Sequence, residues 1–500
     1  MTDRPTSGRR QLSRNAAVSV IQTVASAGLM FVLYRAVLQS VGSEGLGVWS
    51  VVLASTGAVR IGELGLTGSA VKYAAGRLAR GETDAASRVI ETTVLTVAVV
   101  IGVLALGAYV ILPRVLPAFI PEGGLPAAIA LVPYACASFW LAAVGGALQS
   151  GLDGCGRIDL RNGVVLIAQV VYVGLGWALV HSDGLIGLAV AQIVQGGLLC
   201  LGAWALTRRV LPAAPPVPWR WDRPLFQEML GYGLQYQVLG VVRMLYEPTT
   251  KALLGRYGGL DAAGLYEVAT LVVTKIRALL IAAQQALTPE IASLQETRPS
   301  DIDAVLTSAD RLNWFLSVPV FVGAAASAPL VSAVMIGHVD LLFVAFSVLL
   351  SAGWFVNAIS GPAYFVMLGT GQMRGVVASH ITTGAINFVA GWGLGIIAGG
   401  VGIALGWAIA LIFGALHLLL WVQAERGVRI APPREAIPLA ACGVVAVGLG
   451  ATAVVWGKSW VVVVVPLVAL VLMIPPLLRS PSRHRVVSVL RAALGRPSAG

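Results

Sequence analysis

The side chains with the greatest potential for chemistry in this sequence are charged residues that interrupt long apolar segments. The cations are Arg35, Arg60, Arg243, Lys251, Lys275 and Arg277, and the acids are Glu63, Glu247 and Glu267. A Lys or Arg at the centre of a bilayer costs about 2.5–3.5 kcal/mol, so six uncompensated cations would cost on the order of 15–20 kcal/mol. Side chains this costly pair with one another or line a water-filled cavity.

Part of this charge is compensated along single helices, because residues three or four apart share a helix face. The sets that can pair in this way are Arg60 with Glu63, Arg243 with Glu247 and Lys251, and, more loosely, Glu267 with Lys275. Six cations against three acids still leave a surplus of three positive charges. This surplus predicts a cationic site.

We expect the site to be a cavity that binds an anionic substrate, lined by Arg60, Arg243, Lys275 and Arg277. Glu63, Glu247 and Glu267 are predicted to serve in ion coupling or in charge pairing. Structural ion pairs between helices are the alternative, with Arg35, Lys251 and Glu267 reaching the outer membrane interface. Lys275 and Arg277 are two residues apart and point in different directions, which leaves one of them for a structural role.

The composition places these charges in a membrane protein. Of 500 residues, 57% are hydrophobic and only 11% are charged, whereas a soluble chain has about 25% charged residues. The 58 glycines favour close packing between helices. The fold class predicted is all-α and polytopic.

Apolar stretches of about 20 residues, the length that crosses a bilayer, number fourteen. They are residues 15–38, 46–71, 90–112, 126–149, 163–181, 185–207, 231–254, 263–289, 312–336, 341–369, 376–398, 400–423, 437–456 and 460–478. With the N-terminus inside, the inside segments hold 25 Lys or Arg and the outside loops hold three. This asymmetry places both termini in the cytoplasm.

Short motifs recur along the chain at a nearly constant offset. Val41-Gly42 recurs as Tyr257-Gly258, and Pro113 as Pro329; Gly154-Cys155-Gly156 recurs as Gly369-Thr370-Gly371, and Gly187-Leu188-Ala189 as Gly402-Ile403-Ala404. Because six spans separate the copies, the two repeats are expected to run in the same orientation.

The repeats define the expected domains. These are a cytoplasmic tail (1–14), an N-lobe of six spans (15–207), a proline- and arginine-rich cytoplasmic linker (208–230), a C-lobe of six spans (231–423), an extra helix pair (424–478) and a second cytoplasmic tail (479–500).

Motifs for enzymatic or nucleotide-driven chemistry are weak. Gly457-Lys458-Ser459 has Thr452 where a P-loop needs its earlier glycine, so it is a chance match. The five histidines and four cysteines are dispersed without metal-ligand spacing. We therefore predict no enzyme activity, no metal or other cofactor and no nucleic-acid partner.

Several polar and aromatic residues allow two interpretations. Trp49 and Tyr266 occupy equivalent repeat positions and could stack on sugar rings or anchor the chain at the interface. Asn357 and Asn387 could bind sugar hydroxyls or join helices.

The early run Gly-x-x-Gly-Leu-Gly-Val-Trp (42–49) and Gly-Glu-Leu-Gly-Leu (62–66), ahead of the basic segment 72–88, resemble bacterial polysaccharide and O-antigen flippases. These belong to the multidrug/oligosaccharidyl-lipid/polysaccharide exporter superfamily. The resemblance implies a multi-pass protein of the cytoplasmic membrane that moves a polyprenyl-pyrophosphate-linked oligosaccharide from the inner to the outer leaflet. It also implies membrane lipids, and potentially a polymerase and glycosyltransferases of polysaccharide or lipopolysaccharide biosynthesis, as partners.

Two other functions remain open from the sequence. One is a multidrug or organic-cation antiporter of the same superfamily, although an acidic rather than a cationic site would suit it. The other is a non-transporting membrane scaffold for polysaccharide enzymes.

The predicted topology can be checked with reporter fusions. Fusions at Arg80, Pro216 and Pro433 should report a cytoplasmic position and fusions at Glu122 and Asp261 an external one, because basic residues are concentrated in alternate loops. An external reading at Pro216 would contradict the division into two six-span lobes.

Overall fold

The computed structural model describes residues 5–57, 63, 65–284, 287, 291, 294–295, 297–428, 430, 432–433 and 468. Every regular element within these ranges is a helix, which confirms the all-α prediction. The chain divides into two compact units, Met1–Arg256 and Tyr257–Gly500.

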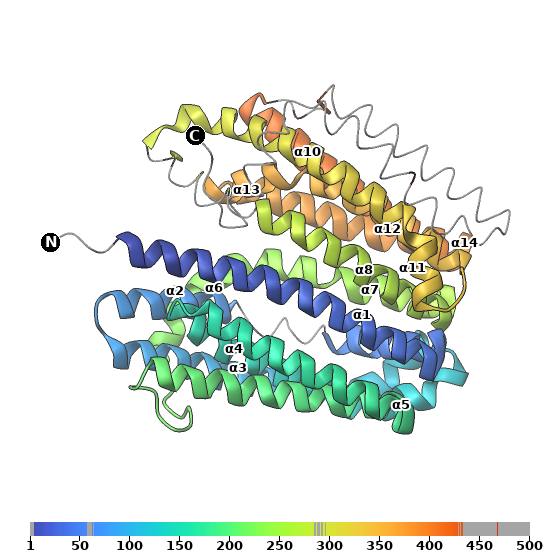
Figure 1. Cartoon of the computed structure of the whole chain (residues 1–500), viewed down its shortest axis with the longest axis horizontal. Coiled ribbons are helices and arrows are strands. Elements are labelled where there is room, and N and C mark those ends of the chain that lie inside the picture. Colours follow the sequence, from blue (N-terminus) through green and yellow to red (C-terminus); the bar gives the residue numbers. More distant parts are fainter. Residues whose placement is uncertain are drawn as a thin grey trace. The chain divides into compact units, whose positions relative to one another are not determined.

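The first unit contains seven α-helices in its described part. They are α1 (Pro5–Gly57), α2 (Leu66–Ala79), α3 (Thr83–Val115), α4 (Leu125–Gly154), α5 (Ile158–Val210), α6 (Arg223–Met244) and α7 (Tyr246–Leu253). Helix α4 packs against both α3 and α5, and α1 runs beside α5 (Figure 1). Helix α2 contacts α3, α4 and α6, so it ties the start of α6 to this bundle.

The second unit contains six labelled α-helices in its described part. They are α8 (Gly259–Gln284), α10 (Ile302–Ala326), α11 (Ala328–Met335), α12 (Leu341–Ile359), α13 (Gly361–Gly369) and α14 (Met373–Arg426). Helix α12 is central, because it packs against α8, α10 and α14. Helices α10 and α11 meet at a bend of 48°.

The boundary between compact units differs from the predicted boundary between lobes. The sequence places the span 231–254 in the C-lobe, but α6 and α7 pack against α2 and α1 and so fall in the first unit. The predicted lobe limits describe the internal repeat and remain a prediction.

Six described helices are long and apolar enough to cross a membrane, or seven if the bent pair α10 and α11 forms one span. Two of them, α5 and α14, each contain two of the predicted spans. The predicted pair at 437–456 and 460–478 lies outside the described residues, apart from Val468. Helix α3 presents a mostly exposed apolar face at Val99, Val103 and Leu106, as expected for a surface in contact with lipid.

Glycines break the long helices at the turns that the sequence predicts. Gly184 interrupts α5 with φ 56° and ψ −132°, and Gly399 interrupts α14 with φ 56° and ψ −137°. These two positions correspond to each other in the repeat and share a conformation that L side chains rarely adopt. Gly156 (φ 70°) and Gly371 (φ 74°) form a second pair with the same offset. The repeat is therefore visible in backbone geometry as well as in sequence.

Beyond each break, the chain folds back closely on itself. A Cβ atom at Gly187 would stand 2.3 Å from the carbonyl oxygen of Leu179, and one at Gly402 would stand 2.0 Å from that of Leu394. Both pairs are again related by the same offset. Only glycine permits this approach of two backbones.

The basic segment 72–88, expected to be a loop, is helical except at residues 80–82. Helix α2 continues to Ala79 because Leu66, Ala70 and Ala74 on one face are buried against α3 and α4. The turn between α2 and α3 is confined to residues 80–82.

Substitution of the hairpin glycines tests this packing. Gly402→Ala and Gly187→Ala should each cost about 1–3 kcal/mol, because the methyl group meets backbone that cannot move independently. Gly393→Ala in α14 is the matched control, since a Cβ there meets nothing within 4 Å. Thermal unfolding in detergent should show lower midpoints for the first two variants alone. Equal midpoints for all three would contradict the tight hairpin.

Candidate functional site

The structure distributes the predicted site residues over both units. Arg60 lies outside the described residues. Arg243 is exposed near the C-terminal end of α6 in the first unit. Lys275 and Arg277 are partly buried on α8 in the second unit. A cavity shared by all four cations remains a prediction.

Arg277 has the most specific surroundings of these cations. Its guanidinium carbon lies 4.0 Å from the ring centre of Trp354 on α12, and its Nη2 donates to Oδ1 of Asn357 at 3.3 Å. Stacking on a tryptophan face stabilises a guanidinium that is partly removed from water. Asn357 therefore joins two helices and also orients the cation.

Further aromatic rings extend from this stack. Trp354 meets Trp407 of α14 edge to face, with ring centres 5.8 Å apart. The backbones of α12 and α14 approach closely at the preceding residue, where a Cβ on Gly353 would stand 2.9 Å from the Cα of Ala408. This close approach brings the two tryptophans into contact.

A neighbouring group on α10 and α12 has the same character. Trp314 and Phe321 both pack edge to face against Phe355. The indole Nε1 atoms of Trp314 and Trp354 are buried and meet no acceptor within the described part of the chain. A buried N–H group normally has a partner. These donors and the guanidinium together suit a ligand rich in oxygen and negative charge.

The predicted charge stripe on the seventh span is divided by a helix break. Helix α6 ends at Met244 and α7 begins at Tyr246, so Arg243 lies on a different helix from its expected partner. Glu247 and Lys251 form an ion pair with 2.5 Å between Oε1 and Nζ. Lys251 is only 3% exposed, and whether it lies at the outer membrane interface stays a prediction. Its ammonium is held by Glu247.

The remaining predicted acidic and aromatic residues are partly or fully buried. Glu63 and Glu267 are partly buried. Trp49 and Tyr266 are both buried, and Tyr266 packs edge to face against Phe346. Core packing covers both rings, which leaves little of either surface open for stacking on a sugar.

The sequence analysis missed a buried charge cluster in the first unit. Glu91 on α3 is fully buried, with 0% exposure. Nε of Arg220, in the connector between α5 and α6, donates to Oε1 of Glu91 at 2.9 Å. Nη1 of Arg220 donates to Oδ1 of Asp84 at 2.7 Å. The hydrogen bond to Glu91 raises the pKa of the Arg220 guanidinium above its ordinary value, so this cation remains charged.

Backbone groups complete this cluster and fix the connector on α3. The amides of Trp219 and Arg220 donate to Oε2 of Glu91 at 3.3 and 3.1 Å. The Trp221 indole donates to Oγ1 of Thr96 at 3.0 Å, and the Asp222 amide to Oγ1 of Thr92 at 3.2 Å. The sequence shows an acid at the edge of a predicted span and an arginine in the predicted linker. The sequence analysis did not predict that these two residues pair.

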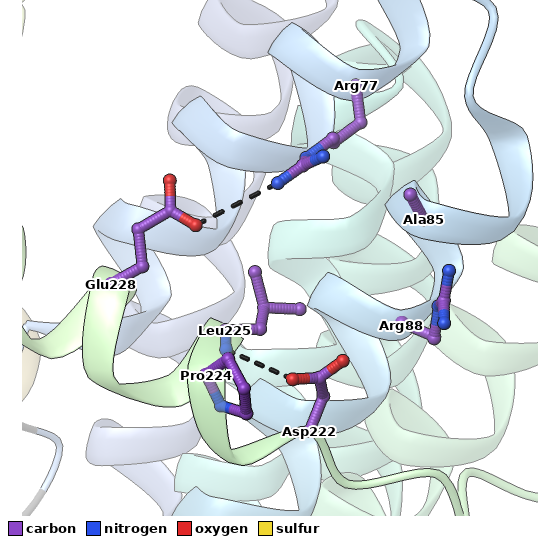
Figure 2. Close-up of a pocket in the computed structure, with 7 residues that line it drawn as sticks. All are labelled: Arg77, Ala85, Arg88, Asp222, Pro224, Leu225 and Glu228. Carbon is purple, nitrogen blue, oxygen red and sulfur yellow. Dashed lines mark hydrogen bonds and ion pairs between the residues drawn. The ribbon is translucent and has the colours of Figure 1, made fainter.

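An open pocket of about 210 Å³ lies beside this connector (Figure 2). It is lined by Arg77, Ala85, Arg88, Asp222, Pro224, Leu225 and Glu228. Its charges are already matched: Arg77 reaches Glu228 at 3.8 Å, Arg88 reaches Asp84 at 3.4 Å, and Asp222 accepts from the Leu225 amide. At its edge, hydrogen bonds from Arg80 and Arg77 lower the pKa of Glu82. The residues that line the pocket thus join α6 to α2 and α3. Because their charges are paired with one another, the pocket has little free charge with which to bind a ligand.

Comparison with known proteins identifies the class. Residues 82–339, just over half of the chain, match a family described as "Polysaccharide biosynthesis protein". The chain belongs to this family. The family resemblance found in the sequence is thereby confirmed.

Solved structures with the same fold include a multidrug transporter and a lipid flippase. An inward-facing multidrug resistance MATE family transporter of the MOP superfamily superposes with a TM-score of 0.69 at 13% identity, covering 83% of this chain and 98% of the other. The lipid II flippase MurJ in an inward closed conformation also has a TM-score of 0.69 at 13% identity, over 95% and 100% of the two chains. No match was found among curated protein sequences. These similarities establish the fold of a multi-pass membrane transporter.

The connector cluster gives a stability prediction. Arg220→Ala should lower stability by about 3 kcal/mol, near the lower end for breaking a buried pair, because Glu91 is left buried without its cation while Arg220 itself is one-quarter exposed. Arg223→Ala, an exposed arginine three residues later, is the control. Thermal unfolding of both variants in detergent checks this. Indistinguishable midpoints would show that the pair contributes nothing.

Proposed function

We propose that this protein is a flippase that moves a polyprenyl-pyrophosphate-linked oligosaccharide from the inner to the outer leaflet of the cytoplasmic membrane. The observation that carries the proposal is the Arg277 guanidinium stacked on Trp354 within an apolar helix bundle. Membership of a polysaccharide biosynthesis family supports a saccharide substrate. The MurJ-like fold supports translocation across a membrane.

The chemistry of this group suits both ends of such a substrate. An arginine fork can bind phosphate oxygens through two hydrogen bonds, and a lysine such as Lys275 adds a more mobile charge. Tryptophan rings and indole N–H groups suit a sugar, which presents apolar faces and hydroxyl oxygens. In this proposal Arg60, Arg243 and Lys275 complete the cationic cavity together with Arg277.

The membrane potential could supply part of the driving force. With the cytoplasm negative, each negative charge moved outward gains about 2.3 kcal/mol per 100 mV. A pyrophosphate would therefore be driven outward without ATP. Both termini lie in the cytoplasm in this proposal, where the substrate is made, and glycosyltransferases and a polymerase are the expected partners.

A multidrug exporter is the second candidate, because a transporter of that kind shares the fold. Its cationic substrates would be repelled by Lys275 and Arg277, and the described part of α12 carries no acid to balance them. A scaffold without transport activity does not account for the buried N–H donors beside Arg277.

Substitution of the cations tests the proposal. Arg277→Ala should reduce flipping about tenfold or more, and Arg277→Lys should reduce it as well, because lysine loses the planar fork and the ring stacking. Arg60→Ala, Arg243→Ala and Lys275→Ala are expected to act in the same direction. Accumulation of lipid-linked oligosaccharide in the inner leaflet of cells lacking the native protein measures the loss.

Arg374→Lys, at an exposed position at the start of α14, is the matched control and should leave flipping unchanged. The amount of each variant in the cytoplasmic membrane must be equal for the comparison. Normal flipping by all four alanine variants would show that these charges are structural and that the substrate binds elsewhere. Export of organic cations instead of lipid-linked saccharide would favour the second candidate.

A further inference from the structure

A buried carboxyl in the second unit has no role in the site described above. Asp310 on α10 is 5% exposed, and its Oδ1 meets no hydrogen-bond partner within the described part of the chain. No ion pair involving Asp310 occurs among those residues either. A carboxylate removed from water without a cation or a donor is costly, so such a group either carries a proton or holds a cation.

No side chain on the same face of α10 bonds to Oδ1 of Asp310, including Trp314, whose Nε1 is likewise buried without a partner among the described residues. Ile302 and Leu306 lie toward the helix start and are apolar and buried. Asn313, one turn further on, is saturated: its Nδ2 donates to the carbonyl oxygens of Ala358 and Ile359, and its Oδ1 accepts from Gln284 and Ser317. An amide has two N–H groups, and both are used here.

The first unit contains a similar pair of acids on one helix, and there an arginine bonds to both of them. Asp84 and Glu91 are the second and ninth residues of α3, and Asp303 and Asp310 are the second and ninth residues of α10. In α3, Arg220 reaches both acids. In α10, Nη1 of Arg426 reaches Asp303 at 2.7 Å, and Asp310 is left without a counterpart of Arg220 in the described residues.

Few titratable groups on the packed elements can influence Asp310. Arg311, adjacent and exposed, favours the charged form of the Asp310 carboxyl. Removal of that carboxyl from water disfavours the charged form more strongly. Helices α11 and α12 carry no titratable side chain, and α13 carries Tyr364 alone. The charged residues of α8 are Asp261, Glu267, Lys275 and Arg277.

We propose that Asp310 is a proton-binding site near the N-terminal end of α10. Protonation forms an O–H bond on the carboxyl and removes its charge, and deprotonation returns the proton to water. The ligand proposed is a proton and not a metal ion, because the described residues contain no group of three or more acidic, histidine or cysteine side chains that could hold a metal. The proposal does not depend on which substrate the protein moves.

The test uses the purified full-length protein in lipid nanodiscs. A hydrophobic carbodiimide modifies carboxyl groups only in their protonated form, and peptide mass spectrometry locates the product. Near about pH 7, modification at Asp310 should exceed that at Asp303 and Glu91 about tenfold, because each of those two acids forms an ion pair with an arginine and Asp310 forms none among the described residues. Modification at Asp310 should fall as the pH is raised, since the reactive protonated form is lost.

Two outcomes of the labelling would overturn the proposal. The first is absence of modification at Asp310 at acidic pH while an added peptide carboxyl reacts. The second is protection of Asp310 by sodium at concentrations where potassium has no effect, which would make the site a cation site.

Asp310→Asn provides an independent measurement of stability. If the native group carries a proton, the isosteric amide should shift the midpoint of thermal unfolding by less than about 2 °C. If an arginine or a bound cation neutralises Asp310, the amide would leave that charge buried and lower the midpoint clearly. Glu91→Gln is the matched control, and it should lower the midpoint because it removes the partner of Arg220.

Discussion

Hydrocarbon offers no hydrogen-bond partner to a backbone amide or carbonyl, and this constraint shapes both units. Long helices satisfy it over most of the chain, so each break needs a specific compensation. At the break between α12 and α13, Asn313 of α10 donates to the carbonyl oxygens of Ala358 and Ile359 at the end of α12. At Gly184 and Gly399, glycine instead allows a tight reversal, and the chain continues as helix at once.

The same low-polarity surroundings decide where charge is tolerated. Glu91 can be fully buried because Arg220 and two backbone amides surround its carboxylate. Arg277 is retained on α8 because a tryptophan face and an amide oxygen replace part of its hydration. In both cases the compensating groups come from another element, so the charge also fixes how elements pack. The connector between α5 and α6 is thereby a structural part of the first unit and not a loose tether.

Periodic properties of the sequence predicted most of the fold. Apolar length, charge asymmetry and the constant offset of the repeat depend on local composition, and they anticipated the helices and the turns at Gly184 and Gly399. The site was predicted less completely, because pairing between distant residues cannot be read from spacing. Arg277 was recognised as costly, but its stacking on Trp354, which is distant in the chain, depends on the packing of α8 against α12. Glu91 and Arg220, which are 129 residues apart, were missed for the same reason.

Duplication gave the two units one backbone plan, but their charges have diverged. The ninth residue is an acid in both α3 and α10, Glu91 in one helix and Asp310 in the other. An acid with a dedicated arginine is held in an ion pair that joins two elements of the fold. An acid without one can exchange a proton with water, so its charge can change while the fold remains the same. In the proposed function, a proton that binds Asp310 more tightly in one conformation than in another would shift the balance between those conformations.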